Sequence, residues 1–107
     1  MMQPNDTLFK SLGDPTRRRL FEHLCLEGEQ TVRALTERAG ISQPAVSKHL
    51  VVLKGAGLVA GQQLGRETHY AARSDALRPL VEWADQMTRF WEVKFDRLDE
   101  VLKRMDQ

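Results

Sequence analysis

The chain has 107 residues, of which 41% are hydrophobic and 29% are charged, and its formal net charge is +1. This size and composition are typical of one globular domain and argue against intrinsic disorder. No apolar run approaches the roughly 20 residues of a membrane-spanning helix, and the stretch MMQPNDTLFK lacks the apolar core of a signal peptide, so the sequence predicts a cytoplasmic protein.

Positive charge is concentrated in the middle of the chain. Residues 31–73 hold six lysines and arginines against two glutamates, whereas residues 74–107 hold six basic and eight acidic side chains. Between Ile41 and Glu67 there is no acidic residue at all. A solvated surface usually mixes both signs of charge, so this segment indicates a polyanionic partner.

Two helices are predicted in the first quarter of the chain. The first spans residues 6–12, and the second begins after Asp14, a suitable N-cap followed by proline, and ends at Gly28. The apolar residues of the first are Leu8, Phe9 and Leu12, and those of the second are Leu20, Phe21, Leu24 and Cys25.

A helix-turn-helix unit is predicted over residues 31–57. Thr31 caps a short helix, VRALTERA, with Val32, Leu35 and Ala39 facing inward, and Gly40-Ile41 forms the turn. Ser42 and Pro44 then start a further helix over 42–56, whose buried face is Val46, Leu50 and Leu53 and whose end is marked by Gly57.

The next segment predicts a β-hairpin over residues 58–72. The runs LVAGQQL and THYAA flank a tip of Gly65-Arg66-Glu67, and a single glycine leaves the turn type open. A helix-turn-helix followed by a hairpin with a basic tip is a winged helix. The predicted fold is therefore mainly α with a small β-hairpin, in the order α-α-α-α-β-β-α.

One long helix is predicted over residues 76–105, with Pro79 as a point where it could bend. Its apolar residues recur every three or four positions, and it would extend over about 40 Å, which exceeds what so small a domain can cover. We therefore expect part of it to pack against a second copy of the chain. The alternative is a helix packed only on its own domain.

Together these motifs resemble the ArsR/SmtB family of winged-helix repressors. The blocks LGDPTRRRLFEHL, ISQPAVSKHLVVLKGAGLV and GRETHYAA carry the resemblance, which covers about residues 7–107. It implies a homodimer that binds a double-stranded DNA operator with helix 42–56 in the major groove, and that dimerises through its first and last helices. The expected interface residues are Leu8, Phe9, Leu80, Ala84, Met87, Trp91, Phe95 and Leu98.

The DNA contacts can be assigned from side-chain chemistry. Gln43 and Ser47, near the start of the recognition helix, are expected to contact base edges, with Pro44 in the same turn. The remaining residues are Lys48 and Lys54, expected at phosphates; Arg66, at the minor groove or the backbone; and His49, at a phosphate or in a half-buried structural role. Each of them, taken alone, could instead be a solvated side chain, but their clustering argues against this for the group.

The metal-binding motifs of the family are missing, so no metal or other cofactor is expected. Where many members have Cys-x-Cys, this sequence has EQTVRAL, with Thr31 and Arg33 at the thiolate positions. The second common site needs a histidine on the last helix, and none occurs after His69. Phe90-Trp91 followed by KFDRLDEVL resembles a branch of the family that often lacks metal sites.

A cysteine and an aromatic cluster are the other sequence features that bear on how the protein is controlled. Cys25, on an apolar stripe, is expected to be buried and inert, with redox sensing as the alternative, and His23 is expected at the surface. The aromatic cluster of Trp83, Phe90, Trp91 and Phe95 is expected in the core or the dimer interface, with a pocket for a hydrophobic effector as the alternative.

An enzyme and a protein-interaction module are the two alternative functions from other classes. An enzyme is not supported, because no nucleophile with a base, phosphate-binding loop or metal set is recognisable. A winged-helix module that binds proteins instead of DNA is the second alternative, and the missing acids around residues 42–54 argue against it. Repression is the usual role in the family.

Overall fold

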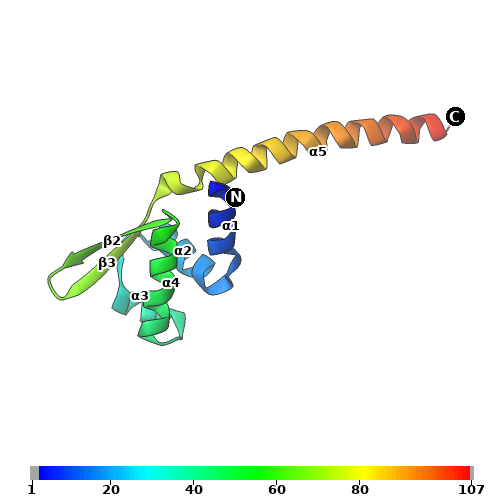
Figure 1. Ribbon diagram of the computed structural model, residues 1–107. Coiled ribbons are helices and arrows are strands. Elements are labelled where there is room, and N and C mark those ends of the chain that lie inside the picture. Colours follow the sequence, from blue (N-terminus) through cyan, green and yellow to red (C-terminus); the bar gives the residue numbers. More distant parts are fainter. Residues whose placement is uncertain (1–2, 107) are drawn as a thin grey trace. The chain divides into compact units, whose positions relative to one another are not determined.

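A computed structural model of the chain describes residues 3–106 (Figure 1). It contains two compact units, of which the first ends at Leu77 and the second begins at Arg78. The elements are α1 (Pro4–Gly13), α2 (Pro15–Glu27), β1 (Gln30–Thr31), α3 (Val32–Ala39), α4 (Gln43–Gly55), β2 (Val59–Leu64), β3 (Glu67–Ala72), a 3-10 turn (Ser74–Leu77) and α5 (Arg78–Met105).

The predicted N-caps of three helices are confirmed. Asp14, Thr31 and Ser42 each accept a hydrogen bond from the backbone amide three residues further on, at 2.9, 3.0 and 3.3 Å respectively. These bonds satisfy amides that the first turn of a helix leaves without partners. They fix where α2, α3 and α4 begin, and so they fix the start of the helix-turn-helix.

The core of the first unit comes from all four of its helices, α1 to α4, and the start of β2. The predicted inward residues of α4, Val46, Leu50 and Leu53, are fully buried, as is Leu35 of α3. The apolar face of α4 therefore packs inward and leaves its other face to solvent. The other buried hydrophobic residues are Leu8, Leu20, Phe21, Leu24, Leu58 and Val59.

The position of Cys25 differs from the prediction. Its spacing from Phe21 indicated burial, but the thiol is exposed. Cys25 lies in the last turn of α2, where the adjacent Leu26 is 83% exposed, so the packing of α2 ends with Leu24.

The sheet has three strands rather than the predicted two. The hairpin of β2 and β3 pairs in the register Val59↔Ala72 to Leu64↔Glu67, and the short β1 adds to the other edge of β3. Figure 1 shows the hairpin projecting beside α3 and α4.

The hairpin tip consists of Gly65 and Arg66, because Glu67 belongs to β3 and not to the turn. Gly65 has φ +64°, and no described residue other than glycine has a positive φ. A positive φ at the first turn residue and a negative one at the second is the pattern of a type II′ turn, which requires glycine at the first position. The turn places Arg66 at the tip.

The second unit is α5, which begins at Arg78 and not at the predicted Ala76. Pro79 is the second residue of the helix, a place that suits a residue without a backbone N–H, so it starts α5 and does not bend it. None of its 28 residues is buried. In the part of the chain that the structure describes, no helix combines the length and apolar character needed to cross a membrane.

Candidate DNA-binding surface

An open groove of about 490 Å³ lies between α3, α4 and the β2–β3 hairpin. We call it the wing groove. Three of the residues singled out for DNA contact, Gln43, Ser47 and Arg66, line it together. Its lining residues are Thr31, Val32, Arg33, Gln43, Ser47, Arg66, Glu67 and Thr68.

Gln43 and Ser47 occupy successive turns on one side of α4. Gln43 is the first residue of the helix and is exposed, whereas Ser47 is half-buried. Because the hydroxyl of Ser42 is used as the N-cap, it is Gln43 and Ser47 that present polar groups to the groove. An amide and a hydroxyl can both donate and accept hydrogen bonds, as reading base edges requires.

The two lysines of α4 lie outside the lining of the groove. Lys48 and Lys54 are both exposed, and so is Pro44 in the first turn. Flexible, exposed ammonium groups suit phosphates, which hold a protein in register without reading sequence.

His49 is half-buried and does not line the wing groove. The pKa of Asp14 is lowered, first by the hydrogen bond from the Arg17 amide and then, among smaller causes, by the charges of Arg17 and His49. The imidazole therefore lies near the start of α2. Of the two roles open to His49, this placement favours the structural one.

Arg33 is a groove residue that the sequence analysis did not assign to DNA contact. It is 81% exposed, and its Nε lies 3.7 Å from Oε1 of Glu37 one turn later. So exposed an ion pair is worth little, which leaves the guanidinium available to another anion. Its place just after the Thr31 cap, at the start of the first helix of the motif, was the available signal.

Comparison with known proteins identifies the family. A helix-turn-helix domain model matches residues 12–62. The chain is 31% identical to the transcriptional repressor SdpR of Bacillus subtilis over 73% of this chain and 86% of that protein. It also matches the crystal structure of an ArsR family transcriptional regulator with a TM-score of 0.77 and 26% identity, over 84% of this chain and 98% of that one. The chain belongs to the ArsR family of winged helix-turn-helix transcriptional regulators.

A second relative is the probable mercury resistance operon repressor of Streptomyces lividans, 40% identical over 68% of this chain. The match spans only 58% of that repressor's length. ArsR-family proteins are DNA-binding transcriptional regulators, and the helix-turn-helix match over residues 12–62 includes Gln43 and Ser47 of the wing groove.

The two residues that the family resemblance places at the Cys-x-Cys thiolate positions make other contacts in this structure. Thr31 caps α3, and Arg33 pairs with Glu37. Between residues 3 and 106, no cluster of three or more His, Cys, Asp or Glu side chains could hold a metal ion.

The exposed Cys25 has the character of an ordinary thiol. Partial burial, and then the negative charge of Glu22, raise the pKa of Cys25 above its usual value of 9.0. The reactive thiolate is therefore disfavoured at neutral pH, which argues against the redox alternative.

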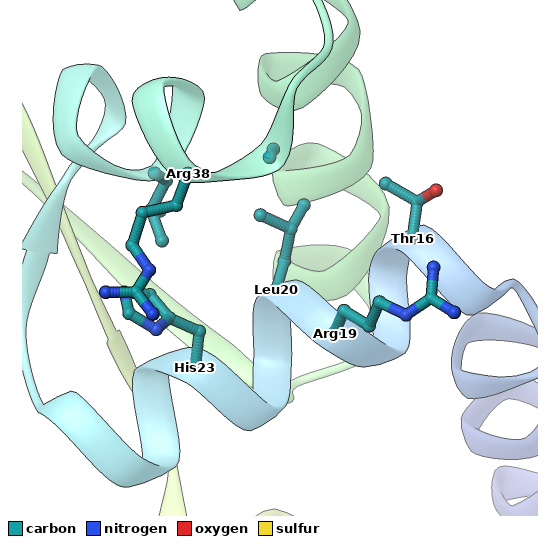
Figure 2. A pocket seen from close by; sticks show the side chains of 7 residues that line it. Thr16, Arg19, Leu20, His23 and Arg38 are labelled. Carbon is teal, nitrogen blue, oxygen red and sulfur yellow. The ribbon is translucent and has the colours of Figure 1, made fainter.

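His23 was expected at the surface, and this prediction is wrong. The side chain is half-buried between α2 and α3, and its Nε2 atom is fully buried. The reason is that His23 lies on α2 beside Leu20 and Leu24, on the side that α3 covers. Figure 2 shows its surroundings.

The residues predicted for the dimer interface fall into two groups. Leu8 is already buried within the chain, at 5% exposed, whereas Phe9 is 42% exposed. Along α5, Leu80 is half-buried and the other five are exposed: Ala84, Met87, Trp91, Phe95 and Leu98. Three of the aromatic residues of α5 contact one another along the helix: Trp91 lies edge-on to Phe90 at 6.1 Å and tilted against Phe95 at 5.8 Å between ring centroids.

Proposed function

We propose that this protein is a homodimeric repressor that binds an operator with residues 42–56 in the major groove and the hairpin against the neighbouring backbone or minor groove. The observation that carries the proposal is the wing groove, where Gln43 and Ser47 of α4 and Arg66 of the hairpin face one space. In this proposal residues 31–57 are the helix-turn-helix, 58–72 the wing and 76–105 the dimerisation segment.

Base reading and phosphate binding are divided between two sets of side chains. Gln43 and Ser47 read base edges, while Lys48, Lys54 and Arg66 bind the backbone, with Arg33 as an addition from the structure. The absence of acidic residues between Ile41 and Glu67 supports this division, because no carboxylate on α4 would repel the phosphates. Repression is supported by the names of the two relatives, both of which are repressors.

Dimerisation is supported by the apolar side chains of α5. Trp91, Phe95 and Leu98 are 55%, 58% and 51% exposed in the single chain. Large apolar residues at this density are costly to leave in water, and a second copy of the same helix is the partner that the family resemblance implies. Of the residues predicted on α1, Phe9 is the one that fits this role.

Control by metal at the two usual family sites is not part of the proposal. The name of the mercury-resistance relative does not transfer to this chain, because Thr31 and Arg33 occupy the positions of the family's thiolates. No cofactor and no catalytic role are proposed. Since an operator-binding protein works where the chromosome is, a cytoplasmic location is included.

The test is binding of the purified protein to DNA from its own upstream region, followed by fluorescence anisotropy at increasing salt. We expect tight binding that weakens steeply with salt, because phosphate contacts release counterions. The titration is repeated with zinc, arsenite, chelator and mild oxidant, none of which should release the DNA. Binding that ignores salt, or no binding to any DNA, would favour the protein-interaction module instead, and release by the oxidant would favour the redox repressor.

A further inference from the structure

A second cavity, of about 250 Å³, lies between α2 and α3 and shares no residue with the wing groove. We call it the α2–α3 cavity. Its volume is just below the roughly 300–1,000 Å³ of pockets that hold drug-sized ligands, so it would suit a small molecule. The lining residues are Thr16, Arg19, Leu20, His23, Leu35, Arg38 and Ala39.

The charge of this cavity is entirely positive. Its lining contains two arginines and a histidine but no carboxylate. In the described part of the chain neither Arg19 nor Arg38 lies within ion-pair distance of an acidic side chain. Two guanidinium groups that line one cavity from opposite ends, with no carboxylate in the lining, favour an anionic occupant.

The arginine run of α2 shows why Arg19 is available. Arg17 donates from Nε to the carbonyl of Ser11 at 2.9 Å, and Arg18 donates from Nη1 to that of Leu12 at 2.9 Å. These two side chains thus satisfy carbonyls at the end of α1. Arg19 makes no such bond among the described residues and lines the cavity instead.

The imidazole of His23 provides an independent observation. Its buried Nε2 has no hydrogen-bond partner within residues 3–106. A buried polar atom without a partner is costly, and most such atoms in proteins find one. Because Nε2 is buried in this structure, an occupant of the α2–α3 cavity supplies the missing hydrogen bond only when the lining side chains move to expose this atom.

Figure 2 shows how the polar groups are distributed. Arg38 and His23 lie at one end, Thr16 and Arg19 at the other, and the apolar side chain of Leu20 lies between them. We propose that the α2–α3 cavity binds a small organic anion, with its acidic group at Arg38 and His23 and its carbon skeleton over Leu20. Inorganic phosphate would meet the charge but not the apolar middle.

The cavity is also placed to act as an effector site, a part of the proposal that rests on the DNA-binding function above. Ala39, in its lining, is the last residue of α3, and the short turn after it leads to α4. If the anion binds more tightly when α3 is in one of two positions, it shifts the chain toward that position. The turn then carries the change to α4 and to its contact with DNA. The anion should therefore alter operator affinity.

The first experiment needs no DNA. Amide NMR spectra of the full chain are recorded during titration with sodium succinate, sodium benzoate and sodium phosphate, at ionic strength held constant with sodium chloride. We expect saturable shifts for residues 16–23 and 35–39 with one of the carboxylates, and weaker ones with phosphate. No saturable shift with any probe would overturn the site, and tighter binding of phosphate would overturn the organic class of the ligand.

Arg38→Gln and Arg19→Gln test the lining without disturbing buried packing, because both side chains are exposed. Arg38→Gln should weaken carboxylate binding by about tenfold or more, the usual effect of losing a hydrogen bond to a charged group, whereas Arg19→Gln, at the other end of the cavity, should have a smaller effect. Arg33→Gln removes the same charge from α3 outside the cavity and should leave anion affinity unchanged. Equal losses in all three variants would mean general charge attraction and would contradict the proposal.

Measurements of operator binding distinguish a cavity that takes a small anion from one that takes a phosphate of the DNA backbone. Without added carboxylate, Arg38→Gln should bind operator like the wild type, whereas Arg33→Gln should bind more weakly. The carboxylate should change operator affinity in the wild type but not in Arg38→Gln. If Arg38→Gln alone weakens operator binding and lowers its salt dependence, the cavity serves DNA phosphate. If the carboxylate binds but leaves operator affinity unchanged, the effector role is wrong.

Discussion

The polar side chains on the first turns of α4 have separate tasks. Ser42 caps the helix with its hydroxyl, whereas Gln43 and Ser47 line the wing groove. His49 does not line the groove, and its charge is one of the smaller causes that lower the pKa of Asp14. Only part of the polar surface of α4 is therefore available for reading DNA. The role of each polar residue can be tested by substituting it singly.

Gln43→Ala should lower affinity for the operator by about tenfold while leaving affinity for unrelated DNA nearly unchanged, since one good base contact is worth about 1–3 kcal/mol. Lys54→Ala should weaken both and reduce the slope of log affinity against log salt by about one. Anisotropy with specific and scrambled duplexes measures both effects. Equal losses on the two duplexes for Gln43→Ala would show that Gln43 does not read bases.

Asp14 makes stability depend on pH in the acid range. Its pKa in the folded protein lies below the ordinary 3.8, mainly because the carboxylate accepts the hydrogen bond from the Arg17 amide. The stabilisation is complete above 3.8, and it is lost as the pH falls through the lower, folded pKa.

Asp14→Asn keeps a good N-cap but removes this titration. The difference in thermal midpoint between wild type and variant should therefore shrink as the pH is lowered below 3.8, measured by circular dichroism. A difference that stays constant across that range would rule out the contribution of the carboxylate.

At the scale of elements, the wing depends on a close approach between its strands. Gly61 of β2 pairs with Tyr70 of β3, and a Cβ added at Gly61 would lie 2.8 Å from Cε1 of the tyrosine ring. The backbone of Tyr70 also pairs with Gln30 of β1, so Tyr70 belongs to the central strand of the sheet.

Gly61→Val should destabilise the protein by about 1–3 kcal/mol, as overpacking does, and weaken operator binding by displacing the wing. Ala60→Val is the matched control, because Ala60 is the exposed neighbour on the same strand and valine suits a strand. Chemical denaturation and anisotropy measure the two effects. A stable Gly61→Val variant with wild-type affinity would show that the ring moves without cost.

The elements that the sequence predicted well are those with local signals. The caps of α2, α3 and α4 and the buried face of α4 depend on residues within a few positions of one another. Strand β1 was missed because it has only two residues, and it is defined by pairing with His69 and Tyr70 far along the chain.

Two features of the sites were missed for a similar reason. Whether Cys25 is buried depends on where the rest of the chain stops packing against α2. The spacing of apolar residues along α2 does not predict that point. The α2–α3 cavity needs Arg19, His23 and Arg38 to meet across two helices, and only the packing of those helices brings them together.

At the scale of the whole molecule, the proposed homodimer explains why α5 carries so many exposed apolar residues. Trp91→Glu should give monomers in sedimentation experiments, because placing a carboxylate in an apolar interface costs on the order of several kcal/mol. The monomers should bind operator weakly, since only one recognition helix can engage at a time. Gln86→Glu introduces the same side chain at an exposed polar position of α5 and should remain dimeric. A dimeric Trp91→Glu variant would contradict an interface on this face.

The most direct test of the account is selection of binding sites from a pool of random DNA duplexes with the purified wild-type protein. A homodimer that reads bases through α4 should enrich a palindromic motif, whose half-sites lie about one helical turn or a multiple of it apart. The enriched sequences should lose their advantage when Gln43→Ala is used for the selection. Failure to enrich any sequence, under salt conditions where the protein does bind DNA, would contradict the claim that this groove reads an operator.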